Sequence, residues 1–193
     1  MNKAEPLAYR MRPKTLEEYE GQEHVIGPGK LLYRTIKADR LSSIILFGPP
    51  GCGKTSLAKV ISETTKYKFY KINAVTAGVS DIKKIVEETK NFMFNPAGKS
   101  ILFIDEIHRF NKLQQDALLP FVENGTIILI GATTENPYFE VNKALISRSM
   151  VIKLEPLTEK NIYNILKRAL TSKEGLGEYN VKIEDNTLMK IAD

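Results

Sequence analysis

One stretch of the chain has the residue types and spacing needed to hold a chain of phosphate groups. It reads Gly48-Pro49-Pro50-Gly51-Cys52-Gly53-Lys54-Thr55 and matches the pattern G-x-x-x-x-G-K-[ST]. Glycines leave the backbone amides bare, and the first turn of a following helix points unpaired N–H groups at an anion. Lys54 would supply a cation for the β- and γ-phosphates, and Thr55 a hydroxyl for Mg²⁺. We therefore predict a nucleoside triphosphate site here, with Ser56 included in it.

The segments on both sides of this loop are those expected to hold it in place. Residues 43–47 form an apolar run bounded by turn residues, which predicts a buried strand. Leu57, Val60 and Ile61 follow the loop at helical spacing, which predicts a helix. A glycine-rich turn with a chance lysine is the alternative, but the fixed spacing and the two flanking elements favour the phosphate loop.

Two carboxylates come directly after another apolar run, residues 101–104. At the carboxyl edge of a parallel sheet, beside a phosphate loop, Asp105 could hold the Mg²⁺ shell. Glu106 would then orient and deprotonate an attacking water. An acidic pair that caps a surface strand is the alternative, and the four apolar residues downstream of a complete phosphate loop favour the catalytic interpretation.

For other polar residues near the predicted strand ends, the sequence leaves alternative roles open. Thr133 and Thr134 could touch a γ-phosphate or the attacking water, or they could satisfy the end of a strand, and the residues alone do not separate these alternatives. Arg148 has the planar fork of an arginine finger supplied by a neighbouring subunit, although a surface arginine is the ordinary interpretation. His108 is expected near the site or at a subunit contact, because the only other histidine, His24, gives it no metal-binding partner.

The rest of the chain alternates predicted strands with predicted helices. The expected strands are residues 43–47, 67–72, 100–106, 126–131 and 150–154. The expected helices are residues 31–40, the segment after the loop, and residues 81–91, 111–121, 158–170 and 183–191, with a short helical turn from Thr15. Pro120 is expected to end the helix over 111–121. This alternation predicts an α/β core over 1–155 with a parallel sheet covered on both faces, followed by a helical part over 156–193.

Composition sets broad limits on the function. The chain has 193 residues, a net charge of +5 and one cysteine, which excludes an intrachain disulfide. No apolar run approaches the roughly 20 residues of a membrane helix. The positive charge is compatible with nucleic acid, but solvated lysines on helix faces are a commoner explanation. Cys52 is interpreted as a small residue at a permissive position, and a redox switch there has no support.

With these motifs in place, the chain resembles AAA+ ATPases of the clamp-loader and branch-migration-motor group. More narrowly, it resembles the replication-associated recombination protein A family (RarA or MgsA), relatives of the Werner-helicase-interacting protein. The resemblance covers essentially the whole chain. The stretches that carry it are the phosphate loop and residues 6–13, 21–24, 73–79, 104–109 and 131–137.

The resemblance implies a fold and a set of site residues. The fold is a three-layer P-loop NTPase (AAA+) core with a five-stranded parallel sheet, followed by the start of a helical lid. ATP and Mg²⁺ are the implied ligands. The resemblance makes Lys54 and Thr55 the Walker A pair, Asp105 and Glu106 the Walker B pair, Thr134 the sensor-1 residue and Arg148 an arginine finger acting in trans. It also makes Val25 and Ile26 the expected adenine contacts and places Arg10 or Arg12 near the nucleotide.

The resemblance also implies a cellular role. It predicts a cytoplasmic, nucleoid-associated ATPase that forms a homo-oligomer and acts on single-stranded, gapped or forked DNA in replication-fork maintenance, recombination and repair. Single-stranded-DNA-binding protein and replisome components are the further expected partners. The alternatives are a clamp-loader subunit or a Holliday-junction branch-migration motor, a nucleotide-gated scaffold with little turnover and, more distantly, a small-molecule kinase. The family continues past this length into a full lid and oligomerisation domains, so we expect a fragment with weak activity or none.

Overall fold

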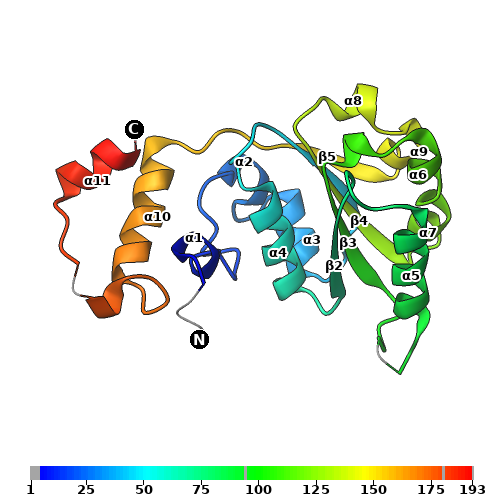
Figure 1. Ribbon diagram of the computed structural model, residues 1–193, viewed down its shortest axis with the longest axis horizontal. Helices are drawn as coiled ribbons and strands as arrows, with labels where there is room; N and C mark the ends of the chain where they lie inside the picture. The colour runs from blue at the N-terminus through cyan, green and yellow to red at the C-terminus, as the bar shows by residue number, and fades with distance from the viewer. Residues whose placement is uncertain (1–4, 94, 180, 193) are drawn as a thin grey trace.

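The structure is a computed structural model that describes residues 5–93, 95–179 and 181–192, and the statements below refer to those residues. Its centre is a five-stranded parallel sheet in the order β2-β3-β4-β1-β5 (Figure 1). The strands are β1 (Ser43–Phe47), β2 (Lys68–Asn73), β3 (Ser100–Asp105), β4 (Ile127–Thr133) and β5 (Ser149–Lys153). The prediction of an α/β core with a five-stranded parallel sheet is therefore confirmed.

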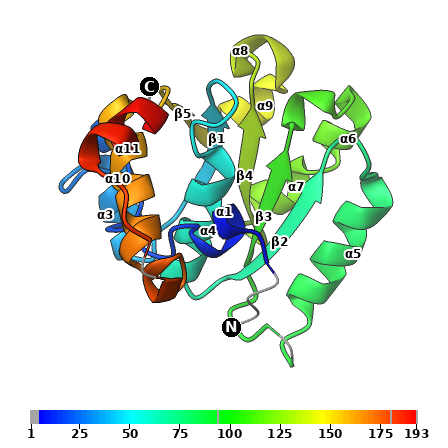
Figure 2. The same cartoon turned by 60° about the vertical axis from the view of Figure 1, so that its left-hand side comes forward.

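Helices cover both faces of the sheet and make a three-layer core (Figures 1 and 2). One face carries α3 (Leu31–Lys37) and α4 (Lys54–Thr64). The other carries α5 (Val79–Lys90), α6 (Lys112–Asp116), α7 (Leu119–Glu123) and α9 (Lys143–Ile146). The remaining short elements are α1 (Leu7–Arg10), α2 (Glu23–Ile26), η1 (Ile107–Arg109), α8 (Pro137–Glu140) and η2 (Gly177–Tyr179).

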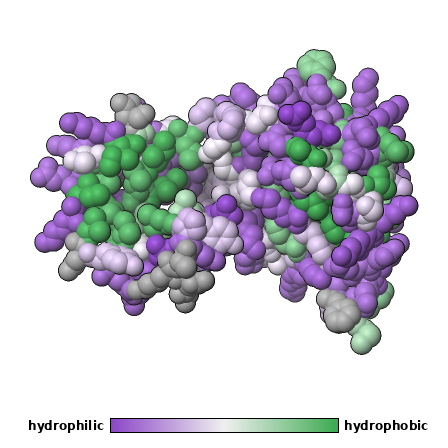
Figure 3. All heavy atoms as spheres, viewed as in Figure 1, coloured by the Kyte–Doolittle hydropathy of each residue, from purple (hydrophilic) through white to green (hydrophobic). Residues whose placement is uncertain are grey.

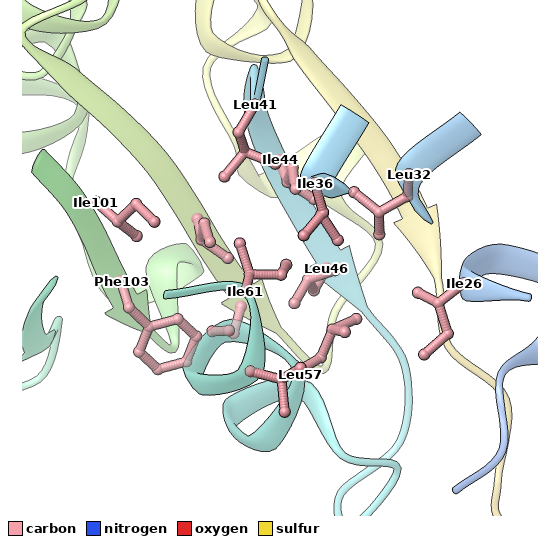
Figure 4. Packing of buried hydrophobic residues seen from close by; sticks show 14 of the residues in the cluster. Ile26, Leu32, Ile36, Leu41, Ile44, Leu46, Leu57, Ile61, Ile101 and Phe103 are labelled. Atoms are coloured by element: carbon pink, nitrogen blue, oxygen red, sulfur yellow. The ribbon is translucent and has the colours of Figure 1, made fainter. Parts of the chain in front are cut away.

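The apolar strands are buried on both faces, which explains their near-continuous hydrophobic sequences. Side chains alternate along a strand, so β1 sends Ile44 and Leu46 toward α4 and Ile45 toward the opposite layer. Leu57 and Ile61 of α4 are completely buried against the first of these sets (Figure 4). This packing fixes the start of α4, and with it the phosphate loop, at the carboxyl end of β1.

The C-terminal helices α10 (Glu159–Thr171) and α11 (Asp185–Ala192) pack on each other at one end of the molecule, where Figure 3 shows a broad apolar surface. The N-terminal segment joins them to the core. The Arg168 guanidinium on α10 donates to the carbonyl oxygens of Met11 at 2.5 Å and Glu18 at 2.8 Å. Among the described residues, no helix has the length and apolar content required to cross a bilayer. The division into parts at residue 156 stays a prediction.

One local prediction is wrong. The segment expected as one helix over 111–121 is divided into α6 and α7, and Pro120 lies in the first turn of α7 instead of ending a helix. Proline is favoured there because a first-turn N–H has no helical partner to lose. The short turn expected from Thr15 is present: the Thr15 hydroxyl accepts from the Glu18 N–H at 3.3 Å, and the Tyr19 N–H donates to the Leu16 carbonyl oxygen at 3.3 Å.

Candidate nucleotide-binding site

The phosphate loop lies between β1 and α4, and two of its glycines are required by close neighbours. A Cβ atom on Gly48 would lie 2.3 Å from the carbonyl oxygen of Leu154. A Cβ atom on Gly53 would lie 2.5 Å from the hydroxyl oxygen of Tyr19, and Gly53 also has a φ of +97°. The loop is therefore held tightly by β5 on one side and by the N-terminal segment on the other.

The helix that follows the loop offers unpaired donors. Gly53 is the N-cap of α4 and has no side chain to accept from the N–H groups of the first turn. The Lys54 side chain, with only 9% of its surface exposed, lies against the loop. Its ammonium donates to the carbonyl oxygens of Gly48 at 2.7 Å and Pro49 at 2.8 Å. Backbone amides, a helix dipole and a buried cation together favour an anion.

Two residues of the N-terminal segment, Tyr19 and Gln22, contact the backbone of the phosphate loop. The buried Gln22 side chain donates to the Glu155 carbonyl oxygen at 2.7 Å and accepts from the Glu155 N–H at 2.9 Å. The Gln22 amide also lies 3.4 Å from the Cys52 carbonyl oxygen. The Tyr19 hydroxyl lies 3.3 Å from the Gly53 carbonyl oxygen, and burial raises the pKa of Tyr19, so the phenol stays a proton donor. These residues connect the loop to the segment that begins the helical part.

The predicted catalytic residues meet at this loop. β4 lies between β1 and β3 in the sheet, and all three strands are parallel, so their carboxyl ends lie at the same edge, next to the loop. One pocket of about 320 Å³ is lined by Pro50, Gly51, Gly53, Lys54, Thr55, Ser56, Asp105, Glu106 and Thr134. Asp105 lies 3.8 Å from the Lys71 ammonium. The structure therefore brings together the Lys54–Thr55 pair, the Asp105–Glu106 pair and Thr134. These residues come from three separate segments of the chain.

Glu106 has an unusual backbone and a histidine neighbour. Its φ is +56°, in the left-handed region that non-glycine residues seldom adopt, and residues with such strained backbones cluster at functional sites. Its Oε2 atom lies 3.4 Å from Nδ1 of His108. The same Nδ1 lies 2.8 Å from the hydroxyl oxygen of the fully buried Thr133, which also accepts from the Glu135 N–H at 2.9 Å. Thr133 thus satisfies the end of its strand, while Thr134 faces the pocket.

The predicted adenine contacts lie elsewhere. Ile26 is buried, 6% exposed, in the hydrophobic core between the sheet and α4. Val25 packs against the same core and lines a separate hollow with Leu32 and Ile152. Neither residue lines the pocket of the phosphate loop, and their role with adenine stays a prediction.

The three arginines named from the sequence also lie outside that pocket. Arg10 donates to the carbonyl oxygen of Glu174 at 2.7 Å, and Arg10 and Arg12 line a cavity of about 310 Å³ that Thr55 also lines. Arg148 lies at the end of α9, where its guanidinium pairs with Glu123 at 2.8 Å and donates to the Ala144 carbonyl oxygen at 2.9 Å. Arg148 therefore makes no contact with the phosphate loop of its own chain.

Sequence reasoning missed the support given by Tyr19 and Gln22 and the contact between His108 and Glu106. Gln22 belongs to residues 21–24, one of the stretches on which the family resemblance rests. Its position directly after Gly21 was the one sequence feature that could have pointed to a structural role. His108 was expected near the site or at a subunit contact. The structure places it directly against the predicted catalytic carboxylate.

Comparison with known proteins defines the class. Residues 44–156 match the family described as "ATPase family associated with various cellular activities (AAA)". The chain belongs to this family of ATPases, whose members share a nucleotide-binding core.

The comparison also identifies particular relatives. The chain is 47% identical to the Replication-associated recombination protein A of Haemophilus influenzae over 189 residues, which are 97% of this chain and 42% of that protein. It is 44% identical to the ATPase WRNIP1 of Dictyostelium discoideum over 97% of this chain and 21% of that protein. The chain thus spans less than half the length of these relatives.

Solved structures agree with this assignment. The Holliday junction branch migration motor RuvB of Thermotoga maritima superposes with a TM-score of 0.73 and 30% identity, covering 95% of this chain and 59% of that one. The predicted AAA+ core and the predicted resemblance to the recombination protein A family are both confirmed.

Proposed function

We propose that this chain binds ATP with Mg²⁺ in the pocket of the phosphate loop and hydrolyses it there. The observation that carries the proposal is the single pocket lined by Lys54, Thr55, Asp105, Glu106 and Thr134. The donor set suits the ligands. Bare amides at the start of α4 and the Lys54 cation fit phosphate groups, while a hydroxyl and a carboxylate are the oxygen ligands that Mg²⁺ prefers.

Each residue of the pocket then has a role in hydrolysis. Lys54 binds the β- and γ-phosphates, and Thr55 and Asp105 hold Mg²⁺, which would neutralise charge on the phosphate oxygens. Glu106 orients the attacking water and accepts its proton. The Thr134 hydroxyl contacts the γ-phosphate or that water. Val25, Ile26 and Arg10 remain our predictions for contacts to the adenosine part.

Arg148 is proposed to act on the nucleotide of a neighbouring copy in a homo-oligomer. Its own phosphate loop is out of reach, but 41% of its side chain is exposed and available to a second chain. Arg148 forms an ion pair with Glu123 in which both side chains are about half exposed. Exposed ion pairs of this kind contribute little to the free energy of folding. The Arg148 guanidinium can therefore exchange Glu123 for a phosphate oxygen at small cost.

The cellular function is proposed from the relatives. We propose an ATPase that acts on single-stranded, gapped or forked DNA in replication-associated recombination and repair. Single-stranded-DNA-binding protein and replisome components would be its partners, in the nucleoid. The higher identity to recombination protein A than to RuvB favours this role over a branch-migration motor. A nucleotide-gated scaffold with little turnover is the alternative, and a measurement of ATP turnover distinguishes the two.

The test is ATP turnover by the full-length protein with Mg²⁺, measured without DNA and with single-stranded, duplex-end and forked DNA. The proposal expects turnover that rises with one or more of these DNAs and is lost in Glu106→Gln. ATP binding without turnover under every condition would instead favour the scaffold. If the rate of ATP turnover is the same with and without each DNA, the proposed action on DNA is refuted, while the proposed ATPase activity stands.

A further inference from the structure

A second surface hollow lies next to the candidate site, on the side of α8. It has a volume of about 450 Å³, and its lining includes His108, Lys112, Tyr138, Phe139 and Lys143, which define what we call the α8 groove. Figures 1 and 2 both show α8 projecting from the body of the molecule. Nothing in the proposed hydrolysis mechanism uses Lys112, Tyr138, Phe139 or Lys143.

The aromatic side chains of this groove are unusually exposed. Phe139 is 84% exposed and Tyr138 is 58% exposed, although both belong to a short helix whose first residue, Pro137, is buried. Exposure of this extent forgoes the free energy that burial of a phenylalanine gives, and exposed apolar side chains that gather at one groove are a mark of interaction sites. Lys112 and Lys143 are exposed on the same groove.

The inner wall of the groove reaches the candidate catalytic residue. His108 lines the groove, and its Nδ1 atom lies 3.4 Å from Glu106 Oε2 and 2.8 Å from Thr133 Oγ1. The His108 side chain is only 12% exposed, and it lines the groove while it contacts Glu106, which lines the phosphate pocket. A ligand that shifts His108 would therefore change a direct contact of the Glu106 carboxylate.

We infer that the α8 groove binds a segment of single-stranded nucleic acid, and that His108 transmits its occupancy to Glu106. The inference rests on the ATPase function proposed above and names the site through which DNA would regulate it. Bases stack on Phe139 and Tyr138, and Lys112 and Lys143 pair with the backbone phosphates. His108 is a positioning residue in this scheme, since it acts through Glu106.

The charges of the groove favour a nucleic acid as its ligand. The groove carries two lysines against one carboxylate, Glu140, and the whole chain has a net charge of +5. The lysines of the groove would attract a polyanion. Exposed aromatic rings beside lysines are also the combination with which proteins hold unpaired bases.

The binding part is tested with a fluorescent oligothymidylate and the full-length protein, by anisotropy. Phe139→Ala should weaken binding roughly tenfold, because one stacked base is lost. Phe92→Ala is the matched control, since Phe92 is 72% exposed but lies in the connection between α5 and β3. Equal affinity of Phe139→Ala and the wild type would overturn the inference. Loss of self-association by Phe139→Ala, with DNA affinity intact, would assign the groove to a second copy.

The coupling part is tested by the ratio of DNA-stimulated to unstimulated ATP turnover. Phe139→Ala should keep the unstimulated rate and lose most of the stimulation. His108→Ala should reduce the stimulation ratio without changing DNA affinity, and His108→Asn, which keeps a polar atom near the position of Nδ1, should restore part of it. An unchanged ratio in both Phe139→Ala and His108→Ala, with a stimulated wild type, would refute the coupling but leave the proposed ATPase function standing. A wild type that hydrolyses ATP but neither binds nor responds to DNA would refute the inference together with the DNA part of that function.

Discussion

Replacing Gly53 with alanine tests whether the N-terminal segment holds the phosphate loop. The new Cβ atom would lie 2.5 Å from the Tyr19 hydroxyl oxygen and 3.2 Å from its Cζ atom. At a φ of +97°, an alanine also adopts a strained backbone, which costs roughly 1–2 kcal/mol. The overlap with Tyr19 adds roughly 1–3 kcal/mol. We therefore expect Gly53→Ala to lower the free energy of unfolding by about 2–5 kcal/mol.

Tyr19→Phe separates these two contributions. The hydroxyl makes only long contacts, at 3.3 and 3.5 Å, so Tyr19→Phe alone should cost about 1 kcal/mol or less. In the double variant the nearest obstacle becomes the ring carbon at 3.2 Å, which a small shift relieves. The steric part should then be recovered while the backbone strain remains, giving a coupling energy of about 1 kcal/mol or more.

Thermal unfolding followed by circular dichroism measures the cycle. For a chain of this size, about 1 kcal/mol corresponds to a Tm change of roughly 2–4 °C, so Gly53→Ala should lower Tm by about 4–20 °C. Calorimetry with ATP should show weaker binding in the same variant. Strictly additive effects of the two substitutions would refute the contact between Tyr19 and the loop, and an unchanged Tm in Gly53→Ala would refute the loop geometry itself.

Three further substitutions have defined outcomes. Lys54→Ala should weaken ATP binding at least roughly tenfold by calorimetry, because a charged donor to phosphate is lost; unchanged affinity would contradict its assignment. Arg148→Ala should keep ATP binding and lose turnover, with partial rescue in mixed assemblies whose other subunits supply the arginine, and absence of rescue would exclude a role in trans. Arg168→Ala should destabilise the protein by about 1–3 kcal/mol, because the carbonyls of Met11 and Glu18 lose a charged donor; an unchanged Tm would show that this link is unimportant.

The sheet could be predicted because its strands are short apolar runs separated by amphipathic helices. The runs 43–47 and 101–104 read as strands without any knowledge of their neighbours. The order of the strands could not be predicted from the sequence, because many different orders of parallel strands are compatible with the same pattern of apolar residues. β1 lies between β4 and β5, which follow it by about a hundred residues, and only tertiary packing fixes that choice.

Pro120 shows where local rules fail. Proline disrupts the interior of a helix but is favoured in the first turn, so one residue is compatible with an end and with a start. The fold selects the start, since α6 ends at Asp116 and α7 begins at Leu119. The sequence leaves a similar ambiguity at Val25 and Ile26, whose contact with adenine stays a prediction, because an apolar residue that contacts a base and one that fills a core have the same sequence pattern.

The candidate site was predictable where its residues form contiguous motifs. The phosphate loop and the Asp105–Glu106 pair are each read from a few adjacent residues. The supporting contacts join distant segments, such as Gln22 to Glu155, which are 133 residues apart in the chain. No local pattern reports such a pair, and for the same reason the contact of His108 with Thr133 was not foreseen.

Hydrolysis in this pocket depends, in the proposed mechanism, on the activation of a water molecule by Glu106. The most direct test compares ATP turnover and retained ATP in the full-length wild type and in Glu106→Gln, which has nearly the same size but accepts no proton. Loss of a general base predicts turnover reduced at least roughly 100-fold, with ATP still bound and intact. Turnover of Glu106→Gln at the wild-type rate would contradict the account.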